Sequence, residues 1–462
     1  MTGPSPSSGA SPPEPYFRRW RHLSRPAWLY LLHAGLLTSS LAIYGLFFNL
    51  LVLALGYPRT FLGTLNLVST AVAAMLSVPI WWSVTRLGLR RALLASGLLQ
   101  AISAFMCAFW PTASPLLLAS ALSGGAAVLF HVSAAPFMMR HSDAAARDHL
   151  FSANAAINIG FAGVGSLVAG YLPGLVAPLL SIDVESAAAY RWTFAIAGAG
   201  LVLSLIPLLL VDRGRTPTPA RMGHGRPPVD DRPVTAGRRQ ERPIAARRLA
   251  AIRTWLNREP WRTIINHRWL IIQLLVPPAL ISCGAALLMP YLNLFFKETF
   301  AIPDTVLGQI FAALGITTGF AALAGPIISG RIGKIGTIIL TQAVSIPFLL
   351  LLGFVPMLYV AVGAALARAA LFNMGSPLFD AFAMERIDEN ARPVVIGLIN
   401  GAYSAGYIVA PAISTHVQER YGFAPLFVVT AICYSFAVLA NYWFFVRQGR
   451  RTTVREAAQQ VP

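Results

Sequence analysis

Arg368 is the residue whose chemistry most needs an explanation in this sequence. It lies near the middle of an apolar stretch over residues 358–381, where a charged side chain costs about 3 kcal/mol on membrane-insertion scales. Asp380 in the same stretch is twelve residues away, about 18 Å along a helix, which is too far for direct pairing. We therefore expect the guanidinium to bind an anionic or oxygen-rich group of a solute. The alternative is a structural arginine satisfied by backbone carbonyls.

Other polar side chains inside apolar stretches could hydrogen-bond a solute or join one helix to another. His33 and His131 are the histidines well inside such stretches, and either could titrate near neutral pH, although a packing role is the more common one. Asp380 lies beside Glu385 and Arg386, where we expect an interfacial ion pair and not a proton carrier. The neutral candidates are Asn49, Asn293, Asn154, Asn158, Asn373, Asn400, Tyr44, Tyr291, Tyr403 and Gln273.

The sequence lacks the residue patterns of enzymes and metal centres. No HExxH, nucleophile elbow or phosphate-binding loop occurs. Cys107, Cys283 and Cys433 are far apart and lack metal-ligand spacing. We therefore predict no catalytic residue, no metal and no cofactor. The scarcity of carboxylates within the apolar stretches leaves the driving force of transport open.

Apolar segments long enough to cross a bilayer position these residues. Of the 462 residues, 56% are hydrophobic and 12% are charged, about half the charged fraction of a soluble domain. We predict an all-α integral membrane protein with about twelve transmembrane helices in two six-helix bundles. The predicted spans are 27–55, 61–84, 92–110, 115–139, 150–178, 190–211, 268–296, 305–330, 336–355, 358–381, 394–417 and 422–446.

The distribution of basic residues predicts the orientation. With both termini in the cytoplasm, only four of the 36 Lys and Arg residues lie outside, and this bias is typical of a bacterial inner-membrane protein. It also accounts for the net charge of +18 without nucleic-acid binding. The predicted segments are a disordered cytoplasmic tail at 1–26, bundles at 27–211 and 268–446, a cytoplasmic linker at 212–267 with a possible interfacial helix at 244–257, and a cytoplasmic tail at 447–462.

The two halves of the chain share residues in the same order. Each match alone is weak, but their common order indicates two similar bundles related by an axis along the membrane normal. The matched pairs are Asn49 with Asn293, Gly63 with Gly308, Pro136 with Pro377, Asn154 with Asn400, and Gly160 with Gly406.

Two short loops carry a second repeat, with a glycine that permits a tight turn and a basic cluster that pins the loop at the membrane face. With the six-plus-six organisation and the basic linker, the chain resembles a major facilitator superfamily transporter over residues 27–446. The carboxylate that this family carries in the motif is replaced here by Thr85 and Gly330. The residues kept, for which the resemblance implies a gating role, are Arg86, Gly88, Arg90 and Arg91 in one copy and Arg331, Gly333 and Lys334 in the other.

The resemblance implies a central cavity lined by the first, fourth, seventh and tenth spans, and a secondary transporter that works by alternating access. Efflux of amphipathic drugs is the alternative to uptake of a metabolite or sugar, although residues 163–170 lack the proline of the drug-antiporter motif. Because both loop carboxylates are lost, a non-transporting sensor on the same fold is a further alternative. The expected partners are a small-molecule substrate and the lipid bilayer, with the chain as a monomer.

Overall fold

A computed structural model of the chain describes residues 24–142, 144–211, 268–387 and 392–447. Within this part, twelve helices are long and apolar enough to cross a membrane, and no residue is in a strand. The predicted number of spans is therefore confirmed. The predicted tails, the linker and its interfacial helix lie outside the described residues.

The first bundle, here the N-bundle, contains six helices. Two of them begin with a serine N-cap: the side chains of Ser24 and Ser186 accept hydrogen bonds from the backbone N–H groups of Ala27 and Ala189. The helices are α2 (Arg25–Ala54), α3 (Arg59–Leu87), α4 (Leu89–Phe109), α5 (Ala113–Arg140), α6 (Ala144–Leu180) and α7 (Ala187–Leu209).

The second bundle, the C-bundle, contains the other six spans. Its first span is broken where Pro290, which lacks a backbone N–H, interrupts the helical hydrogen bonds. This span consists of α10 (Arg268–Leu288), the 3₁₀ turn η2 (Met289–Tyr291) and α11 (Leu292–Phe300). The others are α12 (Asp304–Ile332), α13 (Lys334–Phe354), α14 (Leu358–Glu385), α15 (Arg392–Tyr421) and α16 (Ala424–Asn441), which continues as the π-helical turn η3 (Tyr442–Arg447).

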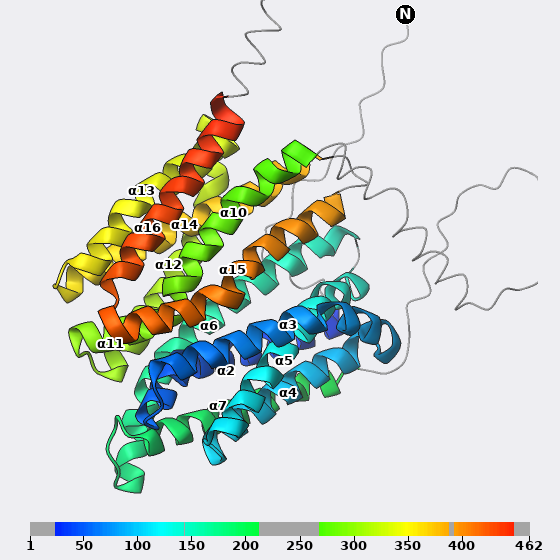
Figure 1. The fold of residues 1–462 in the computed structure, drawn as a ribbon. Coiled ribbons are helices and arrows are strands. Elements are labelled where there is room, and N and C mark those ends of the chain that lie inside the picture. Colours follow the sequence, from blue (N-terminus) through cyan, green and yellow to red (C-terminus); the bar gives the residue numbers. More distant parts are fainter. Residues whose placement is uncertain (1–23, 143, 212–267, 388–391, 448–462) are drawn as a thin grey trace, which may run out of the picture.

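Helix packing repeats between the two bundles. Helix α2 packs on α6 and α7, and its counterpart α10 packs on α15 and α16. Helix α5 packs on α3 and α4 as α14 packs on α12 and α13, and α4 meets α7 as α13 meets α16. The bundles meet through the equivalent pairs α3 with α15 and α6 with α12, and they form two groups of helices in Figure 1. The predicted pair of related bundles is therefore present.

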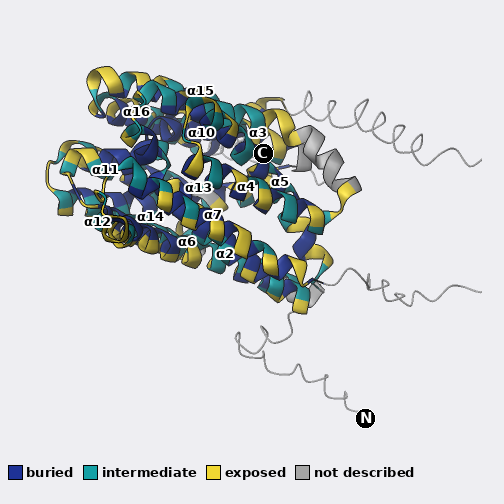
Figure 2. Cartoon of the chain, turned by 90° about the horizontal axis from the view of Figure 1, so that it is seen from below, coloured by how far each residue is buried: buried dark blue, intermediate teal, exposed yellow. Residues whose placement is uncertain are grey.

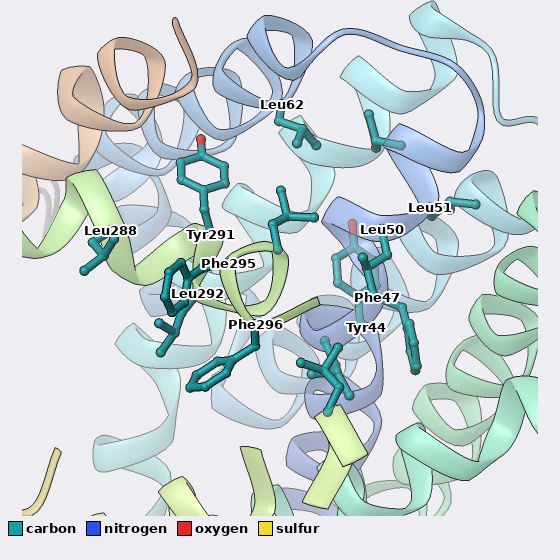
Figure 3. Close-up of a cluster of buried hydrophobic side chains, with 14 of the residues drawn as sticks. Tyr44, Phe47, Leu50, Leu51, Leu62, Leu288, Tyr291, Leu292, Phe295 and Phe296 are labelled. Carbon is teal, nitrogen blue, oxygen red and sulfur yellow. The ribbon is translucent and has the colours of Figure 1, made fainter. Parts of the chain in front are cut away.

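The hydrophobic core is shared at one end of the molecule and divided at the other. We call the end where α7 ends and α10 begins the linker end, and the opposite end the far end. At the far end a single cluster joins both bundles, with Tyr44 and Phe47 of α2 beside Tyr291 and Phe296 of the broken span (Figure 3). At the linker end each bundle has its own cluster. Among the described residues, the two bundles thus share a hydrophobic core only towards the far end.

The outer surface of the molecule is suited to lipid. Exposed residues cover the outward faces of the helices in Figure 2, and many are large and apolar, such as Leu179 and Leu323. Exposed aromatic residues with a polar atom lie near both ends of the spans, as interfacial residues do. They include Trp28 and Trp269 near the linker end and Trp110 and Tyr359 near the far end.

Candidate functional site

Two asparagines close the far end by bonding across the bundles. The Asn49 amide nitrogen donates to the Pro290 carbonyl oxygen at 2.6 Å and to Asn293 Oδ1 at 2.9 Å. In return, the Asn293 amide nitrogen donates to the Leu46 carbonyl oxygen at 2.7 Å. Both side chains are buried. The sequence suggested these residues either as substrate ligands or as links between helices, and the structure shows the second arrangement.

This pair obeys the pseudo-twofold relation between the bundles. Leu46 lies three residues before Asn49, and Pro290 lies three residues before Asn293. Each asparagine therefore donates to the carbonyl oxygen three residues before its own counterpart, which is the reciprocal pattern of a twofold interface. The match between Asn49 and Asn293 in the sequence could have predicted this contact, because matched residues close to a twofold axis lie next to one another.

Matched glycines bring the bundles into close contact on both sides of the axis. A Cβ atom on Gly63 of α3 would lie 2.8 Å from the Ala412 Cα atom in α15. A Cβ atom on Gly308 of α12 would lie 2.6 Å from the Ser166 carbonyl oxygen and 2.7 Å from the Gly170 Cα atom in α6. Since all three distances are shorter than real Cβ contacts, only glycine allows this approach.

Charged side chains reinforce the far end. Lys297 pairs with Glu185, which precedes α7 in the N-bundle, and lies 2.8 Å from Asp304 Oδ1. A second bridge joins the Arg59 guanidinium to Glu298 at 2.7 Å. From the sequence, Arg59 and Lys297 had only a topological role, because Glu298 is 239 residues from Arg59 and Glu185 is 112 residues from Lys297. All the hydrogen bonds and ion pairs between bundles that involve fully described side chains lie in this half.

At the linker end, the described loop contacts stay within one bundle. Gly88 and Gly333 have φ angles of 85° and 75° and begin α4 and α13, so both glycine turns that the sequence predicts are present. Arg90 donates to the Leu208 and Leu209 carbonyl oxygens at 2.7 and 2.8 Å, which satisfies the C-terminus of α7.

The other residues of these loops occupy varied positions. Lys334 pairs with Glu385 at the end of α14, within the C-bundle. Arg91 and Arg331 are exposed, and the side chain of Arg86 lies outside the described part. A gating role for this set stays a prediction.

A polar cavity of about 230 Å³ lies in the N-bundle and reaches η2. We call it the hydroxyl cavity. Its lining is neutral and combines serine and tyrosine hydroxyls with two asparagine amides. The residues are Tyr44, Gly45, Phe48, Asn49, Leu65, Asn66, Ser69, Ser120, Ser123 and Pro290. Of these, the sequence had singled out only Tyr44 and Asn49, because serines on two separate helices show no local pattern.

A second cavity, of about 330 Å³, lies in the C-bundle towards the linker end. We call it the amide cavity. It brings together Asn373, Asn400 and Tyr403, which the sequence had proposed as substrate ligands from two different spans. The complete lining is Pro277, Pro278, Ile281, Gln342, Phe372, Asn373, Phe379, Asp380, Ile399, Asn400 and Tyr403.

Asp380 corrects one expectation from the sequence. We expected an interfacial ion pair, but none of the described ion pairs includes this residue, and Glu385 pairs with Lys334 instead. Asp380 is exposed and lines the amide cavity. The position of Asp380 around the axis of α14 explains this. Asp380 lies one residue from Phe379 and seven from Asn373, so all three residues are on the side of α14 that faces the cavity.

Arg368 lies on α14 one turn before Phe372 of the amide cavity, and it contacts Met289 of η2, the residue before Pro290 of the hydroxyl cavity. Its side chain is buried, and its Nη2 atom is 3.1 Å from the Met289 sulfur. Tyr407 and Tyr434 lie within electrostatic range. Its Nε atom is buried without a hydrogen-bond partner, and none of the described ion pairs includes it. The guanidinium is therefore a buried cation with aromatic and sulfur neighbours.

The two candidate histidines occupy different environments. His33 is buried in the N-bundle, with Nδ1 2.7 Å from the Ser204 carbonyl oxygen of α7. It lines neither cavity, which favours the packing role. His131 is exposed on α5, eleven residues after Ser120 and hence on the same face of the helix. It therefore faces the same side as the hydroxyl cavity, nearer the linker end.

The remaining candidates mainly join helices. Asn158 accepts a hydrogen bond from Thr38 of α2, and its amide nitrogen donates to the Asn154 carbonyl oxygen at 2.8 Å. The Tyr291 hydroxyl donates to the Pro411 carbonyl oxygen at 3.2 Å. Gln273 lies on α10 towards the linker end and lines neither cavity. A contact of these four with substrate stays a prediction.

Twelve spans in two related bundles, packed together at one end and with polar cavities between the ends, form the architecture of a secondary transporter. The family model of the Major Facilitator Superfamily matches residues 32–281 and 278–461, and the chain belongs to this superfamily. The resemblance inferred from the loop motifs is thereby confirmed. The chain is a multi-pass membrane transporter and not an enzyme.

Solved transporters have the same fold at low sequence identity. A bacterial homologue of the human lysosomal transporter Spinster, inward-facing and unoccupied, aligns with a TM-score of 0.65 and 13% identity, covering 94% of this chain and 96% of that one. The nucleoside transporter NupG aligns with a TM-score of 0.64 and 14% identity, covering 91% of this chain and 98% of that one. The D-xylose-proton symporter aligns with a TM-score of 0.64 and 15% identity, covering 94% of this chain and 98% of that one. No curated protein matches this chain in sequence.

Proposed function

We propose that this transporter carries a small, polar, oxygen-rich solute, and that its linker end faces the cytoplasm of a bacterial cell. The observation that carries the proposal is the single core at the far end, which divides into two at the linker end. Such an arrangement is that of an inward-facing state, in which a solute between the bundles can exchange with the cytoplasm. In this proposal the chain acts as a monomer in the inner membrane, since each chain has both bundles.

The chemistry of the interior supports a polar solute. Both cavities offer amide or hydroxyl groups, and Arg368 supplies a cation without a carboxylate partner among the described residues. In our proposal Arg368 anchors an anionic or oxygen-rich group, while Asn373, Asn400 and Tyr403 bind other polar atoms of the solute. Two of the solved neighbours are named for a nucleoside and for D-xylose, which are oxygen-rich solutes.

Flux into proteoliposomes tests the proposal. Labelled sugars, nucleosides and organic acids are offered to the reconstituted protein, and any transported solute is followed in Arg368→Lys and Arg368→Gln variants. We expect KM to rise more in Arg368→Gln than in Arg368→Lys, since lysine keeps the charge but loses the planar donor geometry. Unchanged KM in both variants removes Arg368 from the site. Binding without flux for every solute favours the non-transporting sensor.

A second candidate function, efflux of cationic amphipathic compounds, is favoured by one observation. The unpaired Asp380 shares the amide cavity with Phe372 and Phe379, and a carboxylate beside aromatic rings suits an amine with an apolar body. Efflux is measured in inverted membrane vesicles as drug-dependent fluorescence quenching. Loss of efflux in Asp380→Asn, with retained efflux in Arg368→Gln, selects this function over the first.

A further inference from the structure

We infer that the hydroxyl cavity is a binding site for an uncharged ligand rich in hydroxyl groups, about the size of a pentose or hexose. This inference rests on the proposed transport function and narrows its substrate class. It concerns the N-bundle, whereas Arg368 and the amide cavity belong to the C-bundle.

An unsatisfied hydroxyl marks the site. Ser120 lines the cavity and is buried, with 2% of its surface exposed, and its Oγ atom has no hydrogen-bond partner. A buried polar group in this position is destabilising unless something else satisfies it. Ser123 lies on the next turn of the same helix, and Ser69 and Asn66 face the cavity from α3. These groups can both donate and accept hydrogen bonds, as sugar hydroxyls require.

The lining excludes charged ligands. None of the ten lining residues carries a charge, so an ion would lose its hydration and gain only neutral partners. Arg368 contacts Met289, the residue before Pro290, and does not line the cavity. The Tyr44 and Phe48 rings stack at 5.4 Å between centroids and provide a flat apolar wall.

The size and position of the cavity narrow the ligand further. Sites for drug-sized ligands have volumes of roughly 300–1,000 Å³, so a cavity of about 230 Å³ suits a smaller molecule. Pro290 comes from the C-bundle and the other lining residues from the N-bundle. Asn49 lines the cavity and also bonds across to Asn293. A ligand here contacts both bundles beside the residues that close the far end.

Equilibrium binding to the purified full chain tests the inference without requiring transport. The neutral probes are D-xylose, xylitol and D-glucose, and the charged probes are D-glucuronate and D-glucosamine. Affinity is measured by calorimetry for the wild type, Ser120→Ala and Ser133→Ala. Ser133 is the matched control, because its hydroxyl is also buried and unpartnered on α5 but lies outside the cavity.

We expect a neutral probe to bind at least 10-fold more tightly than its charged analogues. Loss of one neutral hydrogen bond should weaken it about 5-fold in Ser120→Ala, with no change in Ser133→Ala. Should Ser120→Ala fail to fold, Ser123→Ala takes its place. The inference is overturned if the charged probes bind as tightly, if no neutral probe binds, or if neither cavity serine affects affinity, in which case the cavity holds only water.

The two proposals can fail separately. If a solute is transported but its affinity does not change in Ser120→Ala, the proposed transport function stands and the proposed binding site in the hydroxyl cavity is contradicted. Serine-dependent binding of a neutral probe without any flux supports the site and contradicts transport.

Discussion

Removing the Asn49 side chain should shift the transporter towards the state that is open at the far end. In the structure, which is closed at the far end, its amide nitrogen donates to the Pro290 carbonyl oxygen at 2.6 Å and to Asn293 Oδ1 at 2.9 Å. Both acceptors belong to the other bundle, so these bonds must break whenever the far end opens. Asn49→Ala therefore destabilises one conformation and leaves the other unaffected.

The size of the shift follows from the number of bonds. Hydrogen bonds between membrane helices are worth about 0.6 kcal/mol each on average, so two of them give about 1.2 kcal/mol. This corresponds to about an 8-fold change in the conformational equilibrium constant. Leaving the partly buried Pro290 carbonyl oxygen unsatisfied can raise the cost to about 3 kcal/mol. The expected shift in Asn49→Ala is thus about 8-fold, with an upper limit near 150-fold.

Distances between spin labels provide the assay. Cysteines at Val184 in the N-bundle and Met357 in the C-bundle, both exposed near the far end, carry the labels. Cys283 and Cys433 are changed to serine, while the buried Cys107 is kept. The fraction of the longer far-end distance, measured by pulsed electron resonance without substrate, gives the equilibrium constant.

Asn373→Ala is the matched control. Asn373 is also a membrane asparagine, but its amide bonds the Ala369 carbonyl oxygen of its own helix at 2.9 Å. It should leave the distance distribution unchanged. An Asn49→Ala distribution equal to that of the wild type would refute the reasoning. A response in Asn373→Ala as large as in Asn49→Ala would show that any lost amide perturbs the bundles.

Three further perturbations have defined outcomes. Gly308→Ala should populate the far-end-open state in the same label assay, since its Cβ would meet α6 backbone at 2.6 Å, whereas Gly174→Ala on α6, with no atom within 4 Å, should not. Lys297→Met should shift the equilibrium towards the far-end-open state by about 3–5 kcal/mol, because it leaves the buried carboxylate that begins α12 without its cation. Glu185→Gln should shift it by less than about 1 kcal/mol, because the Glu185 side chain is 60% exposed. Arg90→Gln should lower the free energy of unfolding by about 1 kcal/mol, and with it the thermal unfolding temperature, because the α7 carbonyls lose their donor. An unchanged unfolding temperature would contradict this capping role.

The elements of this fold were predictable because their causes are local. Each span is an unbroken apolar segment of sufficient length, and Gly88 and Gly333 each mark a turn that needs a positive φ angle. The ordered matches between the halves predicted two related bundles. By contrast, the sequence misjudged Asp380, because a carboxylate near a span end looks interfacial until the neighbouring helices place a cavity beside it.

The candidate site depended on contacts between distant parts of the chain. The hydroxyl cavity combines side chains from three helices of one bundle with Pro290 of the other, and sequence periodicity cannot show which polar faces meet. The ion pair of Lys297 with Glu185 has the same character, because packing of the bundles brings these two residues together.

The sequence by itself determined how many times the chain crosses the membrane and that its halves are duplicates, because transfer of an apolar helix into lipid depends on that segment alone. Only the tertiary structure decided which end of the molecule is closed and which polar groups line its cavities. Those properties depend on the relative position and rotation of packed helices, and Asn49 and Asn293 became partners only when the two bundles came together.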